Sequence, residues 1–416
     1  MSKYQTQTVY LVDGTRTPFN RQLRHSPNDT SAYSKLDLGL ITARALLLKQ
    51  ALTSTQLDDV IVTSSTSNSN DDLAQQLSQR LGCNTTMRAQ TFSAGENCGL
   101  QALEYAHQQL AFEQKSLILI SGIETSNAKP ITLNTELSQW IREWKNSQGF
   151  TEKLKIFSKL HTRHFLKESN SKQGQDCYYQ QHKETAEKIA NYFSLSAEAM
   201  AEYVKLSQRR LKYAQRNKLI KNIVPLFYPD GSSLYRDEDI INTDPESLKQ
   251  TIITGNPPTG IITKASVAQA TEGACTLLLA NQTALDKYNL TPLAKLSAPT
   301  WNSHNKAIDD LLTSSHHTAS DIDFWEWDET SAAEILALEK SPDFESIDAF
   351  RSLSTVNIDG GSLALGSPNS ANKLRCILQL AYILQRNNAK NGICHFNAVS
   401  GQNSALLLQN MQESDK

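Results

Sequence analysis

The sequence predicts an α/β protein made of two related halves, and three observations lead to that fold class. Short apolar runs of strand length alternate with helical segments from residue 9 to about residue 124. The same order of strand, turn and helix returns between residues 291 and 409. The chain has 416 residues, whereas a single hydrophobic core stops growing at roughly 250–300 residues. We therefore expect at least two cores.

The elements of the first half follow from apolar runs and from leucines at helical spacing. We expect strands at residues 9–13, 59–63, 88–92 and 116–120. We expect helices at residues 36–52, 71–81 and about 96–110. The Thr-Pro step within residues 15–22 indicates a loop after the first strand. Because strands and helices alternate, we expect right-handed crossovers and a mostly parallel sheet.

Beyond residue 124 the pattern changes to long charged helices and loops, which predicts an inserted helical region. Within it, residues 150–167 form a predicted basic amphipathic helix. Its apolar side carries Leu154, Phe157, Leu160 and His164. Such a helix can contact a membrane surface or a partner, although packing against its own domain is the simpler interpretation.

After the insertion the alternation of strands and helices resumes. We expect strands at residues 260–263, 274–280, 291–298, 324–327, 392–396 and 404–409. We expect helices at residues 307–312, 331–340 and 371–385, with a Gly-rich turn at residues 359–368.

The composition bears on partners and on location. Lys plus Arg number 41 against 43 acidic residues, so the net charge of −2 gives no reason to expect a nucleic acid as partner. The six cysteines lack metal-binding spacing and are typical of reduced thiols, so no metal site is expected. No apolar run approaches the roughly 18 residues of a membrane span, and no export signal is evident. We expect a cytoplasmic protein.

The most suggestive stretch for function is an elbow at residues 91–103, where a strand ends, a glycine turns the chain and a helix begins. The first backbone amides of a helix are unpaired and carry the positive end of its dipole, so they stabilise a nucleophile or an anion. The residue at the tip of this elbow is Glu96. We therefore expect the functional site at the elbow.

Five segments in order along the chain resemble the thiolases. They are residues 15–19 (TRTPF), 122–124 (GIE), 153–166 (KLKIFSKLHTRHFL), 263–273 (TKASVAQATEG) and 357–368 (NIDGGSLALGSP). The likeness looks closest to the β-subunit-like thiolases of the fatty-acid-oxidation trifunctional complex, which carry a segment similar to residues 153–166.

This resemblance implies the thiolase fold, a five-layered αβαβα arrangement of two duplicated halves. Residues 1–124 and 244–282 would form the N-terminal half, residues 125–243 an inserted helical loop domain, and residues 283–416 the C-terminal half. The family also implies a homodimer, because its elbow strands pack across a two-fold axis.

Carried over position by position, the four catalytic side chains of the family all differ. The acylated cysteine corresponds to Glu96, the activating histidine to Ser367, the second cysteine to Asn397, and the oxyanion-binding residue to Asp328. Claisen condensation and thiolysis need a thiolate, a base and oxyanion donors. The resemblance therefore implies a degenerate thiolase that serves as a non-catalytic acyl-thioester-binding or partner subunit in fatty-acyl metabolism.

The ligand-binding positions of the family are also altered. Lys264, Ser266 and Ala268 occupy the loop that accepts the pantetheine arm, and His182 lies shortly before the Thr-Ala-Glu motif at residues 185–187. The resemblance implies coenzyme A or an acyl-CoA as ligand, with no other cofactor required.

Three alternatives remain open from the residues alone. If Glu96 and Asp328 face each other and one of the two carboxyl pKa values is raised, they would act as acid and base in a decarboxylase or hydrolase of acyl thioesters. Otherwise Glu96 simply fills space and caps the helix with its charge. Cys98 is the candidate for a shifted nucleophile, although a core thiol is its commoner role. His395 shares a strand face with Asn397, and a structural histidine is the simpler interpretation.

Overall fold

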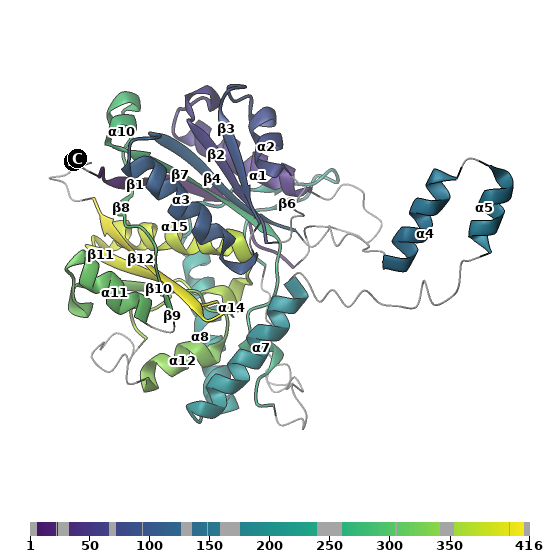
Figure 1. Ribbon diagram of the computed structural model, residues 1–416. Coiled ribbons are helices and arrows are strands. Elements are labelled where there is room, and N and C mark those ends of the chain that lie inside the picture. Colours follow the sequence, from purple (N-terminus) through teal and green to yellow (C-terminus); the bar gives the residue numbers. More distant parts are fainter. Residues whose placement is uncertain are drawn as a thin grey trace, which may run out of the picture.

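The computed structural model places two sheet portions between layers of helices (Figure 1). It describes residues 6–21, 23, 33–65, 72–93, 95–125, 135–147, 149–158, 175–238, 260–303, 306–341, 353–398 and 400–411.

The first sheet portion belongs to the N-terminal part of the chain. Its strands are β1 (Val9–Arg16), β7 (Gly273–Asn281), β4 (Leu117–Glu124), β2 (Asp59–Thr63) and β3 (Arg88–Phe92), in that spatial order. Helices α1 (Lys35–Lys49) and α2 (Leu73–Leu81) pack on its outer face. These elements confirm the predicted ones to within a few residues, except that β4 continues to Glu124 and β1 to Arg16. The extension of β1 is paired, because Arg16 lies opposite Cys275 of β7 rather than in a loop.

The expectation of a mostly parallel sheet is wrong. β2 is parallel to β3 and β4, and β10 (Phe324–Trp327) is parallel to β11 (Asn391–Phe396). The other strand pairs are antiparallel, including β7 with both β1 and β4. A helical crossover brings the next strand back in the same direction, but the long inserted region between β4 and β7 imposes no such direction. β7 therefore enters between its neighbours from the opposite end.

The second sheet portion belongs to the C-terminal part of the chain. Its strands are β8 (Ala294–Leu296), β9 (Thr300–Ser303), β10 (Phe324–Trp327), β11 (Asn391–Phe396) and β12 (Gln402–Asn410). β8 pairs with both β12 and β1, so the two portions are continuous. Helices α10 (Gln282–Tyr288), α11 (Lys306–Ser315) and α12 (Ala332–Lys340) complete this part of the chain up to the Gly-rich turn.

Two helices form the middle layer between the sheet portions, α3 (Cys98–Ala111) and α15 (Asn369–Asn387). They approach each other and β4 closely at two glycines. A Cβ on Gly99 would lie 3.3 Å from Cβ of Lys373, and one on Gly122 would lie 2.8 Å from the Ser370 carbonyl oxygen. The start of α15 is therefore pressed against the start of α3. Helices and sheet portions thus alternate in five layers, αβαβα, and three apolar cores lie between the layers.

Residues 260–263 are not a strand, contrary to the prediction. The backbone amides of Ile261 and Ile262 donate hydrogen bonds to the carboxylate of Glu187, at 3.1 and 3.3 Å. A side chain therefore satisfies these backbone groups, where the apolar pattern suggested a neighbouring strand.

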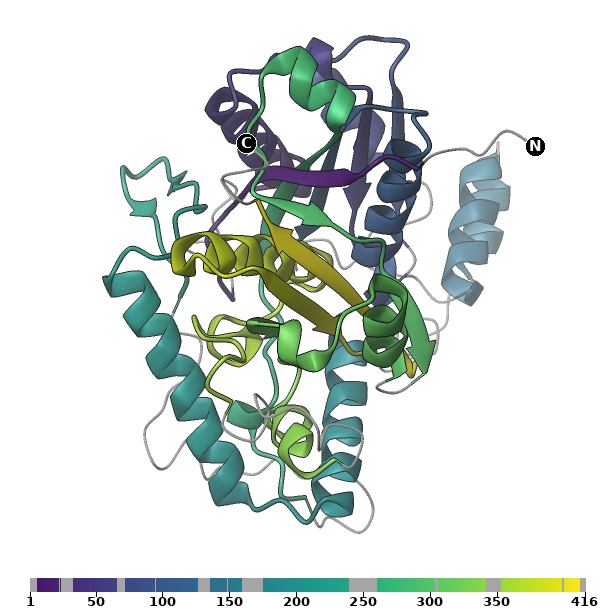
Figure 2. The ribbon, with the colours of Figure 1, turned by 90° about the vertical axis from the view of Figure 1, so that its left-hand side faces the viewer.

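The described part of the inserted region contains helices at two places. Helix α7 (Gln175–Tyr192) lies beside α12, and helix α8 (Ala197–Arg216) lies beside α12 and α14 (Ser362–Leu365). Figures 1 and 2 show these two long helices below the sheet portions. After α8, strands β5 (Leu226–Phe227) and β6 (Ser233–Leu234) form a small hairpin. The predicted boundaries between the halves and the insertion stay a prediction.

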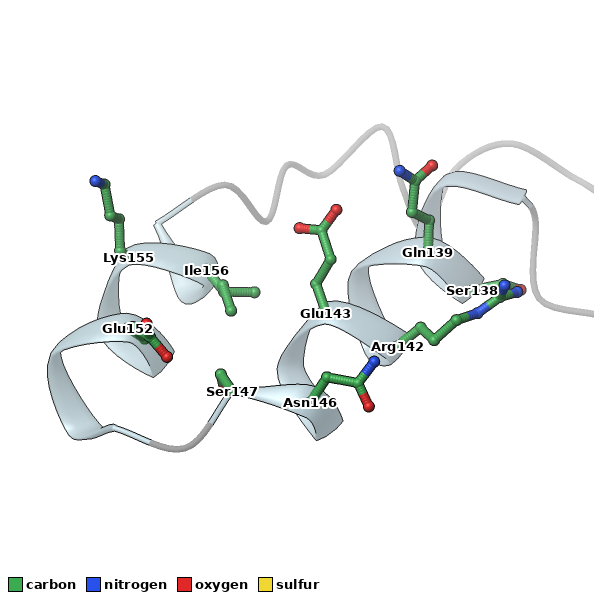
Figure 3. A pocket seen from close by; sticks show the side chains of 9 residues that line it. All are labelled: Ser138, Gln139, Arg142, Glu143, Asn146, Ser147, Glu152, Lys155 and Ile156. Atoms are coloured by element: carbon green, nitrogen blue, oxygen red, sulfur yellow. The ribbon is translucent and has the colours of Figure 1, made fainter.

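Helices α4 (Thr135–Asn146) and α5 (Phe150–Phe157) pack against each other (Figure 1). The predicted basic helix is confirmed as far as Phe157, while its remainder, with Leu160 and His164, lies outside the described residues. Leu154 and Phe157 are more than half exposed. A pocket between the two helices is lined by Ser138, Gln139, Arg142, Glu143, Asn146, Ser147, Glu152, Lys155 and Ile156 (Figure 3). None of these residues comes from the elbow.

The described helices include none that is both long and apolar enough to cross a membrane. Within the same residues, no group of three or more metal-binding side chains is found.

Asp59, the first residue of β2, is a buried carboxyl whose ionised form should cost stability. Burial raises the pKa of Asp59 to about 6, and the charge of Lys115 offsets only part of this effect. A carboxyl group whose pKa is raised in the folded state stabilises that state at low pH. This contribution to stability is lost as the pH rises through about 6. We compare the unfolding free energy of Asp59→Asn with that of wild type at pH 5 and at pH 8. The difference in favour of the variant should be about 1 kcal/mol larger at pH 8. Urea unfolding at both pH values measures this increase.

The neighbouring Asp58 provides a matched control of opposite sign. Burial acts to raise the pKa of Asp58, but hydrogen bonds from Ser116 and Leu117 outweigh burial and lower it. A lowered carboxyl pKa stabilises the folded state above the unfolded pKa. Asp58→Asn should therefore destabilise the protein at pH 8. Equal effects of the two variants would contradict this account.

Candidate active site

The elbow is a short 3₁₀ turn, η2 (Gly95–Asn97), that leads directly into α3. Gly95 has a φ of 72°, a backbone conformation that favours glycine. The side-chain amide of Asn97 donates to the backbone oxygen of Gln402, at 3.5 Å. The tip of the elbow therefore faces the second sheet portion, and Glu96 is buried there.

Glu96 is bound to a histidine from the inserted region. Nε2 of His182, on α7, lies 2.8 Å from Oε1 of Glu96, and the two side chains are only 14% and 8% exposed. Burial acts to lower the pKa of His182, but the hydrogen bond and charge of Glu96, together with the charge of Glu334, raise it overall. The pair is therefore an ion pair below this raised pKa.

Glu334, in the first turn of α12, is a second carboxyl beside His182. Burial raises the pKa of Glu334, an effect partly offset by the charge of His182. Its carboxyl accepts a hydrogen bond from the Thr330 hydroxyl and is hydrogen-bonded to the side chain of Asn397. The amide of Asn397 is thus engaged with a carboxyl group.

Asp328, which follows β10, is compensated by α15. Its carboxylate forms an ion pair with Lys373 and accepts a hydrogen bond of 2.8 Å from Asn372, and both charged side chains are almost fully buried. Burial acts to lower the pKa of Lys373, whereas the charges of Asp328 and Glu96 raise it overall. The positive charge of Lys373 therefore acts on both carboxylates.

This geometry differs from a pair of carboxylates facing each other. Glu96 is paired with His182, and Asp328 with Lys373. We call these four residues, together with Glu334, the charge cluster. It joins the elbow, α7, α12, α15 and the end of β10 in one site.

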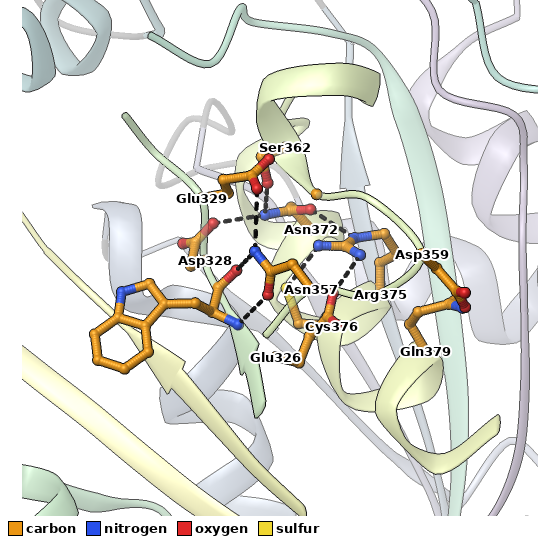
Figure 4. Close-up of polar contacts among 12 residues, drawn as sticks. Glu326, Asp328, Glu329, Asn357, Asp359, Ser362, Asn372, Arg375, Cys376 and Gln379 are labelled. Carbon is orange, nitrogen blue, oxygen red and sulfur yellow. Dashed lines mark hydrogen bonds and ion pairs between the residues drawn. The ribbon is translucent and has the colours of Figure 1, made fainter. Parts of the chain in front are cut away.

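A hydrogen-bonded shell holds the Asp328 side of the charge cluster (Figure 4). The amide of Asn372 also donates to Ser362, at 2.9 Å, while its oxygen accepts from Arg375. Arg375 in turn pairs with Glu326, at 2.8 Å. The side chains of Asn372 and Arg375, three residues apart on α15, are therefore fixed by partners in and next to β10 and at the Gly-rich turn.

Glu329, adjacent to Asp328, has a structural role in the same shell. Its carboxylate accepts hydrogen bonds from the hydroxyls of Tyr203 and Ser207, from the amide of Asn357 and from the backbone amide of Leu363. These donors come from α8, from the segment just before the Gly-rich turn and from α14. One carboxylate thus fixes three segments around the site.

Family models for the two halves match almost the whole chain. The model "Thiolase, N-terminal domain" matches residues 9–283, and the model "Thiolase, C-terminal domain" matches residues 293–410.

The chain belongs to the thiolase family.

Similar thiolases come from bacteria and from animals. The chain is 25% identical to the β-ketoadipyl-CoA thiolase of Acinetobacter baylyi, with 96% of this chain and 99% of the relative covered. It is 24% identical to the mitochondrial 3-ketoacyl-CoA thiolase of Rattus norvegicus, with 97% and 98% covered. It is 22% identical to the mitochondrial trifunctional enzyme subunit β of Bos taurus, with 98% and 90% covered.

Solved thiolase structures share the fold. The acetyl-CoA acetyltransferase of Syntrophomonas wolfei matches with a TM-score of 0.80 at 19% identity, covering 97% of this chain and all of that one. The human mitochondrial 3-ketoacyl-CoA thiolase in complex with CoA matches with a TM-score of 0.75 at 22% identity, covering 97% and 98%.

The loop expected to meet the ligand lies beside the segments that carry Asp328 and Ser367. The backbone amide of Ala268 donates to Thr330, at 2.9 Å, and that of Ser367 donates to Gln269, at 2.8 Å. Ser266 is buried, and its hydroxyl bonds to the backbone of Thr263 within its own turn, η3 (Lys264–Ser266). The loop therefore places Ala268 near the Asp328 segment but turns the Ser266 hydroxyl toward its own backbone.

Two lysines meet at the edge of this loop. Lys264 is exposed, whereas Lys183, next to His182 on α7, is buried. Burial lowers the pKa of Lys183, and the positive charge of Lys264 lowers it further. The positive charges of the two lysines therefore repel each other.

His395 is a buried structural residue. Its ring stacks on Trp327 with 3.9 Å between centroids, and neither ring nitrogen has a hydrogen-bond partner among the described residues. Burial and the charge of Lys373 lower the pKa of His395 to about 3, so the ring is neutral. This agrees with the simpler interpretation of His395.

Cys98 is fully buried, and burial raises its thiol pKa well above the usual range. A protonated, inaccessible thiol does not react as a nucleophile. We expect iodoacetamide to leave Cys98 unmodified in the native thiolase at pH 8, while the partly exposed Cys83 is labelled first. Peptide mass spectrometry with and without denaturant measures this order. Native labelling of Cys98 ahead of Cys83 would revive a shifted active site.

Proposed function

We propose that this thiolase homologue binds an acyl thioester but carries out neither Claisen condensation nor thiolysis. The observation that carries the proposal is Glu96 at the tip of the elbow, in an ion pair with His182 at 2.8 Å. Both reactions pass through an acyl-enzyme thioester, which requires a thiolate at that position. A carboxylate that is already paired offers no equivalent nucleophile.

The rest of the site supports the same proposal. A serine hydroxyl, at Ser367, does not act as a base near neutral pH. The amide side chain of Asn397 cannot transfer a proton to or from a substrate carbon, and it is hydrogen-bonded to Glu334. Asp328, in an ion pair with Lys373, brings negative charge to the place where an oxyanion would need donors.

A thioester of coenzyme A is the ligand that best fits the remaining features. A thiolase of the same fold binds CoA in its crystal structure. Lys183 and Lys264 place two positive charges beside the loop at residues 264–270, where a phosphate group would be attracted. We propose further that the protein is a cytoplasmic homodimer and serves as a partner subunit in fatty-acyl metabolism.

Binding and turnover are measured separately to test this proposal. Calorimetry with a long-chain acyl-CoA should show saturable binding, and Lys264→Glu should weaken that binding about tenfold. Incubation with a 3-ketoacyl-CoA and free CoA should produce thiolysis no faster than buffer alone. Thiolysis at ordinary thiolase rates would end the proposal of a non-catalytic protein.

A second candidate function is decarboxylation of a β-carboxyacyl thioester. The observation in its favour is that the Glu96–His182 pair keeps a proton donor at the elbow. Decarboxylation needs no nucleophile: the C–C bond to the carboxylate breaks, its electrons form a thioester enolate, CO₂ leaves, and a proton from His182 quenches the carbon. Hydrolysis would instead need a free base, which a paired imidazolium does not provide.

The variant Glu96→Gln tests this second candidate. CO₂ release from a malonyl thioester should fall at least tenfold in the variant if Glu96 maintains the charged state of His182. Turnover that is absent in wild type, or unaffected by the substitution, would remove decarboxylation from consideration.

A further inference from the structure

The tip of the elbow is closed by the protein's own side chains. Glu96 and His182 are 8% and 14% exposed, and their paired atoms lie 2.8 Å apart. At this distance no other atom fits between the carboxylate and the imidazole. An acyl group that is to reach the tip must first separate the pair.

His182 is held in this position by the rest of α7. Ala186, one turn further along the helix, and Ala190, one turn beyond that, are fully buried in the core around α12. Glu187 is fixed by the backbone amides of Ile261 and Ile262. The imidazole is therefore presented to Glu96 by an anchored helix.

The charged groups facing His182 come from three further elements. Glu96 is on η2, Glu334 on α12 and Lys373 on α15. The two carboxyl groups favour the imidazolium, and the ammonium of Lys373 opposes it. The attraction of the two carboxyl groups outweighs the repulsion by Lys373. The Glu96–His182 pair is therefore strongest when His182 is protonated, and it weakens when the proton is lost.

We propose that the Glu96–His182 ion pair is an autoinhibitory contact that occupies the acyl end of the site and competes with an incoming acyl thioester. This inference rests on the proposed binding of an acyl thioester. It assigns to Glu96 a function that the loss of the nucleophile alone does not explain, since an uncharged side chain would have removed thiolysis equally well.

The contact predicts that the loss of His182 affects only one of two ligands that share the same nucleotide. His182→Ala should bind decanoyl-CoA about tenfold more tightly than wild type, while the affinity for free CoA, which has no acyl group, stays unchanged. In wild type the affinity for decanoyl-CoA should increase as the pH rises through the raised pKa of His182. This pH dependence should be absent in His182→Ala.

Calorimetry with both ligands between pH 6 and pH 9 measures these effects. Glu96→Gln keeps the shape of the side chain and should reproduce the tighter binding, so the result does not depend on one variant. His107→Gln is the matched control, because His107 lies on α3 and contacts the backbone of Leu296. Circular dichroism verifies that each variant is folded.

The outcomes separate this inference from the proposed function. Equal binding of decanoyl-CoA by wild type, His182→Ala and Glu96→Gln overturns the autoinhibitory contact and leaves the binding function intact. Tighter binding of free CoA as well shows a general opening of the site and also overturns it. If none of the proteins binds either ligand, the binding function and this inference fail together.

Discussion

Lys373→Met should lower the free energy of unfolding by about 3–5 kcal/mol. The substitution removes the ammonium group that compensates Asp328 and leaves a carboxylate in a site where both partners are at most 2% exposed. A buried charge without compensation is among the costliest changes a core can receive. Urea unfolding at pH 7 measures the effect.

A double substitution distinguishes charge from packing. Lys373→Met combined with Asp328→Asn removes both charges, keeps similar volumes and should recover most of the lost stability. Lys340→Met is a surface control, because Lys340 contacts only the backbone of Phe193 and Ser194 among the hydrogen bonds described. If the double variant is as unstable as the single one, packing of the lysine chain rather than charge pairing explains the loss.

Local sequence pattern was enough to predict most elements of the fold. β2, β3 and β10 have the predicted ends because each is bounded by clear turn signals. Strand direction was not predictable in this way. Whether β7 runs parallel or antiparallel to β4 depends on the path of the inserted region between them, which no short pattern encodes.

The candidate site was predictable only where a family motif marks it. Glu96, Asp328 and Asn397 were located through aligned motifs, and the structure brings them into one charged neighbourhood. Lys373 and Glu334 were not identified, because each lies in a helix where charged residues ordinarily face solvent. The one available signal was the run of polar residues at the start of α15, which is buried on all sides.

The inserted region supplied the least predictable part of the site. His182 was expected to meet a ligand, but its pairing with Glu96 joins residues 86 positions apart in the numbering. Side chains that meet over such distances depend on the packing of whole elements, here α7 against α12. Sequence spacing therefore indicates which side chains are available and leaves their partners open.

Glu96→Cys should restore a reactive thiol but not thiolase turnover. The introduced thiol would lie at the start of α3 and close to the imidazole of His182, two features that lower a thiol pKa. We expect iodoacetamide at pH 7 to label it at least about tenfold faster than Cys83, whose own thiol pKa is raised by burial to about 11. Mass spectrometry of a time course measures the ratio.

The same variant should become acylated once and then stop. Incubation with an acyl-CoA should release about one equivalent of CoA as the thiol takes the acyl group. Condensation or thiolysis would next require a base to activate the second substrate, and neither Ser367 nor Asn397 accepts a proton near neutral pH. Glu96→Cys combined with His182→Ala is the matched control and should lose the fast labelling. Repeated thiolysis by the single variant would mean that His182 alone supplies the base. The proposed loss of thiolase chemistry would then depend on Glu96 alone and not on the other three replaced positions.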